Sequence, residues 1–318
     1  MKIKIPDISK QILNKDMLNV FINKYSEIGP QWTITQMEWF NNGYRTFKDH
    51  DKFVILIHLI KKTLDFYTRN FIKLDYDNYF ARPSIELEKF NVIDISNDLN
   101  IPKESTRRKL VELEKDGIIL RDKKKIIIDM SAFISVKPVK TIKKISSFLS
   151  ILSKILADEK ILLKPISSIE LEKVIKANFS YIWKLFYEMQ IPMLLNYKKH
   201  FVDLETFHIF GTCAVNQHLN IQKINESKMN RIEFIKSLYS SDEMSGLNAM
   251  SVSDITGIPR ATVVRKLKRL VKLKNLTIDN KKHYKLTGNS VNQIASLQVI
   301  VLNKLTTFAT QIFNLAIL

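Results

Sequence analysis

Lysine and arginine residues concentrate in two segments of this chain, and binding of a polyanion is the chemistry that they could perform. Residues 101–160 hold 15 Lys and Arg against 8 Asp and Glu, and residues 251–318 hold 11 against 2. These two segments therefore carry +16 of the total net charge of +18. Because cationic side chains neutralise phosphates, this distribution predicts two separate contact surfaces for a nucleic acid.

In each segment, the candidate contact residues fall into two groups along the chain. The first group is suited to contact base edges, and the second group is suited to contact phosphates. In the first segment they are Lys103, Ser105, Thr106, Arg107, Arg108, Arg121, Lys123, Lys124 and Lys125. In the second they are Arg260, Ala261, Thr262, Arg265, Lys266, Arg269, Lys281 and Lys282. The first segment also contains Glu112, Glu114 and Asp116, which either face away from the ligand or indicate weaker binding by this half.

The two segments are copies of one another. Residues 93–128 align with residues 250–285 without gaps, at an offset of 157 residues. The Ile101-Pro102 pair recurs as Ile258-Pro259, and Leu113 recurs as Leu270. A duplicated and fused unit explains this spacing, so we expect two domains, residues 1–158 with a motif at 93–128 and residues 159–318 with a motif at 250–286.

Each copy has the pattern of a helix-turn-helix. A short helix is predicted over residues 95–99 and 252–256, followed by Asn100 or Gly257, which tolerate a left-handed turn conformation. The proline that follows can begin the second helix, where its missing N–H costs nothing. That second helix has an apolar face for packing and a basic face that could lie in the major groove of DNA.

A β-hairpin is predicted after each second helix. In both copies, residues with high β propensity flank a short basic tip, at 121–125 in the first copy and 279–283 in the second. Such a hairpin could contact phosphates or the minor groove.

Both segments resemble the winged helix-turn-helix units of bacterial transcription regulators. Residues 257–263 are similar to the turn and recognition-helix start of many such proteins, and residues 285–287 after the wing resemble the MarR family. The resemblance implies a mainly α fold with two small β-wings. It also implies two-fold pairing through N- and C-terminal helices, which within one chain would give a pseudo-dimer with recognition helices about 34 Å apart.

Apolar stripes at helical spacing flank the motifs and suit helix-to-helix packing, either between the two halves or within each domain. They comprise Phe53, Ile57, Ile60, Leu64, Tyr67 and Phe71; Ile142, Ile145, Leu149, Leu152 and Leu156; and Ile294, Leu297, Val301, Leu305, Phe308, Ile312 and Leu315.

The sequence patterns for a metal site, a reactive cysteine, an effector pocket or an enzyme site are weaker. The spacing of His200, Asp203, His208, Cys213 and His218 matches no standard zinc site, and Cys213 has no basic neighbour in sequence to activate it. The aromatic run of Tyr181, Trp183, Phe186 and Tyr187 fits core packing or the lining of an effector pocket. No phosphate-binding loop or nucleophile elbow is present, so we expect neither an enzyme nor a cofactor.

The sequence thus predicts a cytoplasmic, nucleoid-associated transcription regulator that binds double-stranded DNA sequence-specifically. The single cysteine, the polar N-terminus and the interrupted apolar run at residues 299–318 fit that location without a membrane span. The partner is duplex DNA, a small-molecule effector is left open, and the assembly is a monomer or a dimer of pseudo-dimers. Two alternatives remain: a plasmid-type replication initiator and a scaffold whose winged helices bind proteins.

Overall fold

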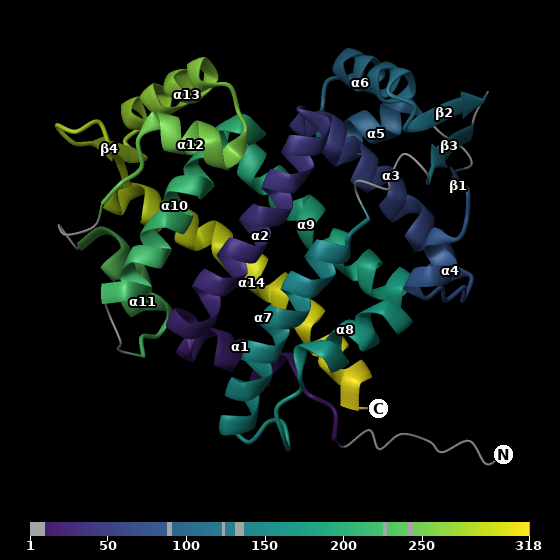
Figure 1. The fold of residues 1–318 in the computed structure, drawn as a ribbon, viewed down its shortest axis with the longest axis horizontal. Helices are drawn as coiled ribbons and strands as arrows, with labels where there is room; N and C mark the ends of the chain where they lie inside the picture. The colour runs from purple at the N-terminus through teal and green to yellow at the C-terminus, as the bar shows by residue number, and fades with distance from the viewer. Residues whose placement is uncertain are drawn as a thin grey trace.

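The computed structural model describes residues 10–87, 91–122, 125–130, 137–224, 228–240 and 245–317. These residues fold mainly as α-helices, accompanied by one three-stranded and one two-stranded antiparallel sheet (Figure 1). The prediction of a mainly α fold with small β elements is confirmed.

The first half of the chain contains seven of the described helices and three strands. They are α1 (Asn14–Asn23), α2 (Tyr25–Phe47), α3 (His50–Arg69), α4 (Tyr76–Phe80), β1 (Ser84–Leu87), α5 (Val92–Leu99), α6 (Lys103–Lys115), β2 (Ile119–Asp122), β3 (Lys125–Asp129) and α7 (Val139–Asp158).

The second half repeats this order, apart from a counterpart of β1. Its elements are α8 (Ser168–Ala177), α9 (Phe179–Phe201), α10 (Leu204–Ile224), α11 (Arg231–Ser240), α12 (Ala249–Thr256), α13 (Arg260–Lys272), β4 (Leu276–Ile278), β5 (Tyr284–Leu286) and α14 (Gly288–Ile317). Helices α1 and α8 both have 10 residues, and α2 and α9 both have 23. The repeated layout therefore extends beyond the aligned motifs, with an offset of 154 residues in the long helices.

The long helices cross between the halves. Helix α2 of the first half packs against α10 of the second, and α9 of the second half packs against α3 of the first, with both long helices near the centre of the molecule (Figure 1). Where the two halves meet, the buried amide of Gln36 donates to the carbonyl oxygen of Gln190 at 3.2 Å. These two glutamines lie at equivalent positions, 154 residues apart, so each half contributes the same residue to one contact.

A second pair of equivalent contacts fixes the ends of the long helices. The backbone N–H of Ser26 donates to Met229, and the N–H of Met229 donates to the Ser26 hydroxyl. The same two hydrogen bonds join Ser180 of the second half to Leu74 of the first. In each half, one serine therefore forms hydrogen bonds to the segment near the fourth helix of the other half.

The two predicted hairpins are present. Strands β2 and β3 pair with Ile119 opposite Ile128, and β4 and β5 pair with Leu276 opposite Leu286. Strand β1 pairs with β3 and was not predicted, although its four residues alternate between polar and apolar side chains and bury Ile85 and Leu87. At the corresponding edge of the second hairpin, Leu247 forms an isolated bridge to Tyr284.

The apolar stripes of α3 and α7 are buried apart from Phe71, whereas the stripe of α14 is buried in its middle and only partly buried at Ile294, Leu297 and Leu315. All five stripe residues of α7 are inaccessible to solvent, and those of α3 are buried from Phe53 to Tyr67. Phe71 does not continue the stripe, because α3 ends at Arg69 and the Phe71 side chain is 91% exposed. Helices α7 and α14 each pack against elements of both halves, so the stripes contribute to packing between the halves.

The C-terminal helix is long and apolar enough by composition to cross a membrane, over residues Gln293–Ile317. Half of its most apolar window is buried inside the structure, where α14 packs against α1, α9 and α11. This packing agrees with its interpretation as an amphipathic core helix.

Candidate nucleic-acid interface

The same turn joins the two helices of each motif. Asn100 and Gly257 both adopt the left-handed conformation, with φ of 48° and 73°. The Ser96 hydroxyl donates to the backbone oxygen of Ile101 at 2.6 Å, and Ser253 donates to Ile258 at 2.7 Å. Because Ile101 and Ile258 are buried, each turn is held by both a hydrogen bond and an apolar anchor.

Helices α6 and α13 lie at the same end of the molecule, at the top of Figure 1. Each is fixed by an internal lysine that binds the N-cap aspartate of the helix beneath it. The Lys109 ammonium lies 2.8 Å from Asp49, and that of Lys266 lies 2.6 Å from Asp203. Burial by itself raises the pKa of Asp203, but hydrogen bonds from Lys266 and Thr206 hold it below its usual value.

Lys266 therefore does not belong to the contact surface predicted from the sequence. It is only 8% exposed and forms ion pairs with Asp203 and with Glu205. The helical spacing placed it beside the packing stripe, and the acids that bind it come from α10 and its cap, which the local sequence pattern does not reveal.

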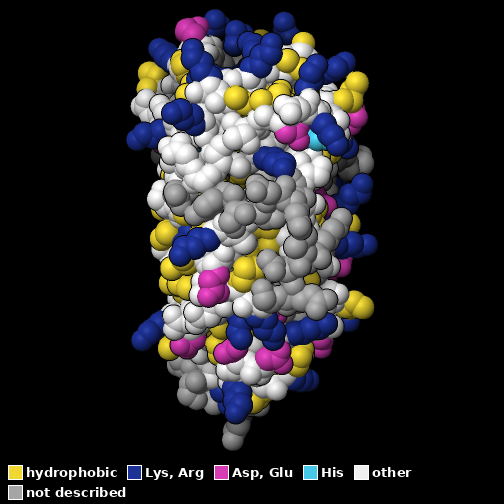
Figure 2. Space-filling view, turned by 90° about the vertical axis from the view of Figure 1, so that its left-hand side faces the viewer, with side chains coloured by type: hydrophobic (Ala, Val, Ile, Leu, Met, Phe, Trp, Pro, Cys, Tyr) yellow, Lys and Arg dark blue, Asp and Glu magenta, His cyan; other side chains and the backbone are white. Residues whose placement is uncertain are grey.

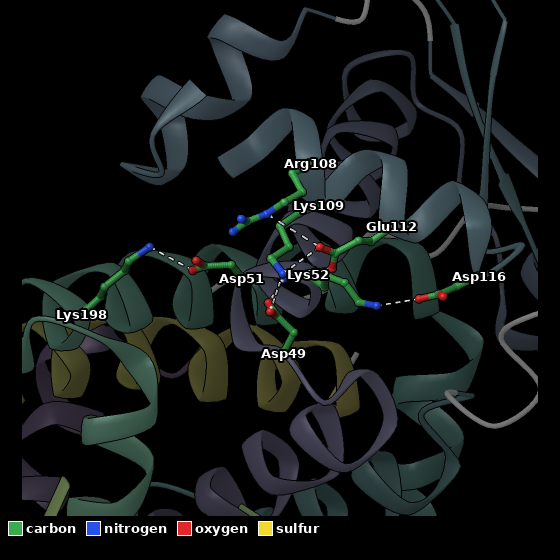
Figure 3. A network of polar contacts seen from close by, with 8 residues as sticks. All are labelled: Asp49, Asp51, Lys52, Arg108, Lys109, Glu112, Asp116 and Lys198. Atoms are coloured by element: carbon green, nitrogen blue, oxygen red, sulfur yellow. Dashed lines mark hydrogen bonds and ion pairs between the residues drawn. The ribbon is translucent and has the colours of Figure 1, made fainter. Parts of the chain in front are cut away.

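Further ion pairs hold the first motif in place (Figure 3). Lys52 of α3 binds Asp116 at the end of α6, at 2.5 Å. Lys198 of α9 binds Asp51 at 3.0 Å, so the second half also holds the helix on which the first motif rests.

The second motif is held in turn by the first half. Near the C-terminal end of α2, Arg45 donates to the backbone oxygen of Ile255 at 2.7 Å, and Asn41 donates to the same oxygen at 2.8 Å. This oxygen belongs to the last turn of α12, whose carbonyls need donors from outside the helix. The second motif is thus bound directly by a long helix of the first half, whereas the first motif is held through α3, which α9 binds.

Helix α13 presents a row of cations to solvent. Arg260, Arg265, Lys268 and Lys272 are exposed, and these four have no ion-pair partner among the described residues. Figure 2 shows Lys and Arg side chains gathered over the end of the molecule where α13 lies. Lys268 and Lys272 were not among the predicted contacts, although they follow Ala261 and Arg265 at steps that keep them opposite the buried stripe.

Arg269 is also on α13 but is not fully available. Its side chain is 42% exposed, and one guanidinium nitrogen lies 3.8 Å from Asp203. It can reach a ligand only at the cost of weakening that contact.

The cations of α6 are mostly paired with acids of the same helix. Arg107 binds Glu104 at 2.9 Å, and Arg108 lies 3.8 Å from Glu112. Lys103 is exposed at the start of the helix, where the described residues provide no ion-pair partner. The first motif therefore offers fewer free positive charges than its sequence suggests.

The first hairpin is similarly paired. Arg121 binds Glu114, and this pairing lowers the pKa of the Glu114 carboxyl. Lys125 lies 3.5 Å from Glu86 on the neighbouring strand β1. The predicted phosphate contacts Lys123 and Lys124 lie outside the described residues.

The second hairpin uses its single acid to shape its tip. The Asp279 carboxylate accepts hydrogen bonds from the backbone N–H groups of Lys281 and His283, at 2.9 and 2.8 Å. The hydrogen bond from the His283 backbone is the main cause of the lowered pKa of Asp279. Lys281 and Lys282 are exposed, consistent with their predicted position at a wing tip.

Among the uncharged candidates, the prediction that Thr106 contacts DNA is wrong. It is completely buried, and its hydroxyl donates to backbone oxygens of Ile101 and Pro102. It closes the turn and is removed from the candidate interface. Ser105 and Thr262 are half-buried and Ala261 is exposed.

The remaining sequence candidates are dispersed or buried. Among the described residues, no group of three His, Cys, Asp or Glu is placed to hold a metal ion. Cys213 is buried, which raises its pKa to about 12. Trp183 and Tyr187 line a cleft of about 490 Å³ between α2, α3, α7 and α9, whereas Phe186 packs edge-on against Trp39.

Comparison with protein-family models, with curated proteins and with solved structures finds no match for this chain.

Proposed function

We propose that this protein is a transcription regulator that binds double-stranded DNA through two winged helix-turn-helix units arranged as a single-chain pseudo-dimer. The observation that carries the proposal is the row of exposed, unpaired cations on α13, at the same end of the molecule as the exposed face of α6.

The local geometry supports helix-turn-helix units. In both motifs a left-handed residue ends the first helix, an equivalent serine closes the turn, and a 13-residue second helix follows. A 13-residue helix is about 20 Å long, which suits insertion into the major groove. A two-stranded hairpin follows each second helix in the position of a wing.

Reciprocal contacts between equivalent residues support the pseudo-dimer. In a two-fold interface the same surface patch contacts its own copy. The Gln36 and Gln190 pair has this property, and so do the Ser26 and Ser180 contacts. An arrangement of this kind would direct α6 and α13 toward successive major grooves of one duplex.

The side chains near the cations favour duplex DNA over single strands. Proteins that bind single strands stack bases on exposed aromatic rings. Within the described residues, the exposed phenylalanines are Phe66 and Phe71, at the end of α3 rather than on α6 or α13. Double-stranded RNA is a poor fit, because its deep major groove does not admit a helix.

A salt titration of affinity for random duplex DNA tests the proposal. Each phosphate contact contributes about −0.9 to the slope of log K against log salt concentration, so Arg260→Ala/Arg265→Ala is expected to reduce the steepness by about 2. The matched control is Lys154→Ala/Lys173→Ala, which removes two exposed charges from α7 and α8 and is expected to leave the slope unchanged.

Binding without salt dependence, or equal losses in both double variants, would contradict a contact surface on α13. In that case the scaffold alternative, in which the motifs bind protein, would replace the proposal. If the slope behaves as expected, selection of preferred sequences follows, and an imperfect palindrome is expected because α6 and α13 differ in sequence.

A further inference from the structure

A small, partly open cavity lies between the long helix of the first half and three helices of the second. It has a volume of about 90 Å³ and lies between α2 on one side and α10, α11 and α14 on the other. Its lining is largely apolar, with side chains such as Phe21, Phe210 and Leu302.

Three polar side chains that line this cavity carry buried atoms without a hydrogen-bond partner in the described part of the chain. These atoms are the indole Nε1 of Trp32, the guanidinium Nε of Arg231 and the Nδ1 of His218. Trp32 is 5% exposed and His218 is 3% exposed, so bulk water does not satisfy them. A buried polar atom without a partner costs about 1–3 kcal/mol, so a ligand that accepts hydrogen bonds from the indole and guanidinium nitrogens would be stabilised in this cavity.

The chemistry of these atoms defines the occupant. Indole and guanidinium nitrogens donate hydrogen bonds and do not accept them. Arg231 also brings a positive charge, and no acidic side chain among the described residues pairs with it; its Nη2 donates to the backbone oxygen of Ala295 at 2.6 Å. The best complement is a group that accepts several hydrogen bonds and carries a negative charge, such as a carboxylate.

The corresponding region of the other half lacks these features. Positions equivalent to Gly29 and Thr33 of α2 are occupied there by Trp183 and Tyr187 of α9, which line the cleft described above. None of the described side chains that line that cleft carries a buried polar atom without a partner. The two halves therefore differ here: among the described residues of these two sites, small residues and unpartnered donors occur together in the cavity that Trp32 and Arg231 line.

We propose that the cavity beside α2 is a binding site for a small monocarboxylate, with its carboxylate on Arg231 and Trp32 and its carbon chain against the apolar lining. The volume limits the size, since a cavity of about 150 Å³ is known to hold benzene, and this one is smaller. The occupant is thus an acid of a few carbon atoms.

Butyrate and its uncharged analogue butyramide are the probes for this site. Saturation-transfer NMR with the full chain is expected to detect butyrate binding, and butyramide is expected to bind at least about tenfold more weakly because it lacks the charge. The thermal midpoint should rise with butyrate and not with equal concentrations of butyramide or sodium chloride.

Two variants assign the binding to the cavity. Arg231→Gln and Trp32→Phe each remove a donor, and each is expected to weaken butyrate binding at least about tenfold. Lys236→Gln removes an exposed charge from the same helix as Arg231 and is expected to bind butyrate as the wild type does. Trp32→Phe keeps an aromatic ring in place, so this variant tests the binding site even if Arg231→Gln does not fold.

Equal binding of butyrate and butyramide, or unchanged butyrate binding in both Arg231→Gln and Trp32→Phe, would overturn the site. Absence of butyrate binding would do the same and would leave ordered water as the occupant. These measurements contain no DNA, so their failure is separate from failure of the proposed function.

Discussion

The two motifs of this protein share their geometry and differ in their free charge. Both have the same turn and the same internal lysine on an N-cap aspartate. On α6, however, Arg107 and Arg108 lie beside Glu104 and Glu112. Four exposed cations of α13 have no such partner in the described structure, namely Arg260, Arg265, Lys268 and Lys272.

The contacts that the fold requires are thus similar in the two motifs, whereas the surface charge is not. The turn residues and the internal lysines are determined by packing, so they are similar in both copies. Surface charge is free to diverge, because exposed ion pairs contribute little to stability. If the proposed function holds, α13 provides most of the affinity for DNA and α6 provides less.

The largest expected effect concerns the internal lysine that both motifs share. Lys266→Ala removes the internal cation that binds Asp203 and leaves a partly buried carboxylate without its main partner. We expect a loss of about 3 kcal/mol in the free energy of unfolding, measured by urea denaturation. Arg265→Ala on the exposed face is the control and should change stability by less than about 0.5 kcal/mol.

Lys109→Ala should resemble Lys266→Ala, since Lys109 binds Asp49 in the same way. A neutral effect of both substitutions would mean that the motifs are held by apolar packing alone.

An intermediate effect concerns the region between the two motifs, where His50 of the first half and His208 of the second pack together with ring centroids 5.1 Å apart. Burial lowers the pKa of His208 to about 3, and burial with the nearby His208 and Lys266 charges lowers that of His50. The unfolded chain therefore takes up protons below pH 6.5 while the folded chain does not, and stability falls as the pH drops through that range.

For His208 alone the expected loss is about 2 kcal/mol between pH 7 and pH 5. Urea denaturation at several pH values measures this loss, and His208→Gln is expected to make the dependence shallower by a similar amount. An identical pH dependence in wild type and His208→Gln would show that this histidine is not held neutral in the fold.

The smallest expected effect concerns the surface charge that differs between the motifs. It is tested by exchanging one charge between equivalent positions. Glu104 in α6 corresponds to Ala261 in α13, 157 residues later. Ala261→Glu is expected to weaken binding to duplex DNA about tenfold, because it places an acid among unpaired cations that would contact phosphates. Glu104→Ala is expected to strengthen binding about threefold by releasing Arg107.

Fluorescence anisotropy with a labelled duplex measures both variants, and Glu170→Ala on α8 serves as a control for the loss of an acid. If the two exchanges changed affinity in the same direction, unequal free charge could not explain the roles of the motifs.

The motifs were predictable because their signals are local. The left-handed turn at Asn100 and Gly257, the helix that begins after each proline, and the two hairpins depend on residues only a few positions apart. The apolar stripes were visible for the same reason. Strand β1 was missed because an alternation over only four residues is a weak local signal, and its pairing with β3 joins residues about 40 positions apart.

The sequence by itself determined the duplicated motifs, the mainly helical composition and the two concentrations of positive charge. The tertiary structure decided which charges remain available, because the partners of Lys266 and Lys125 come from other elements of the fold. It also decided how the halves combine. The crossing of α2 and α9 and the cavity beside α2 arise from contacts between residues that are far apart in the sequence, which no local pattern encodes.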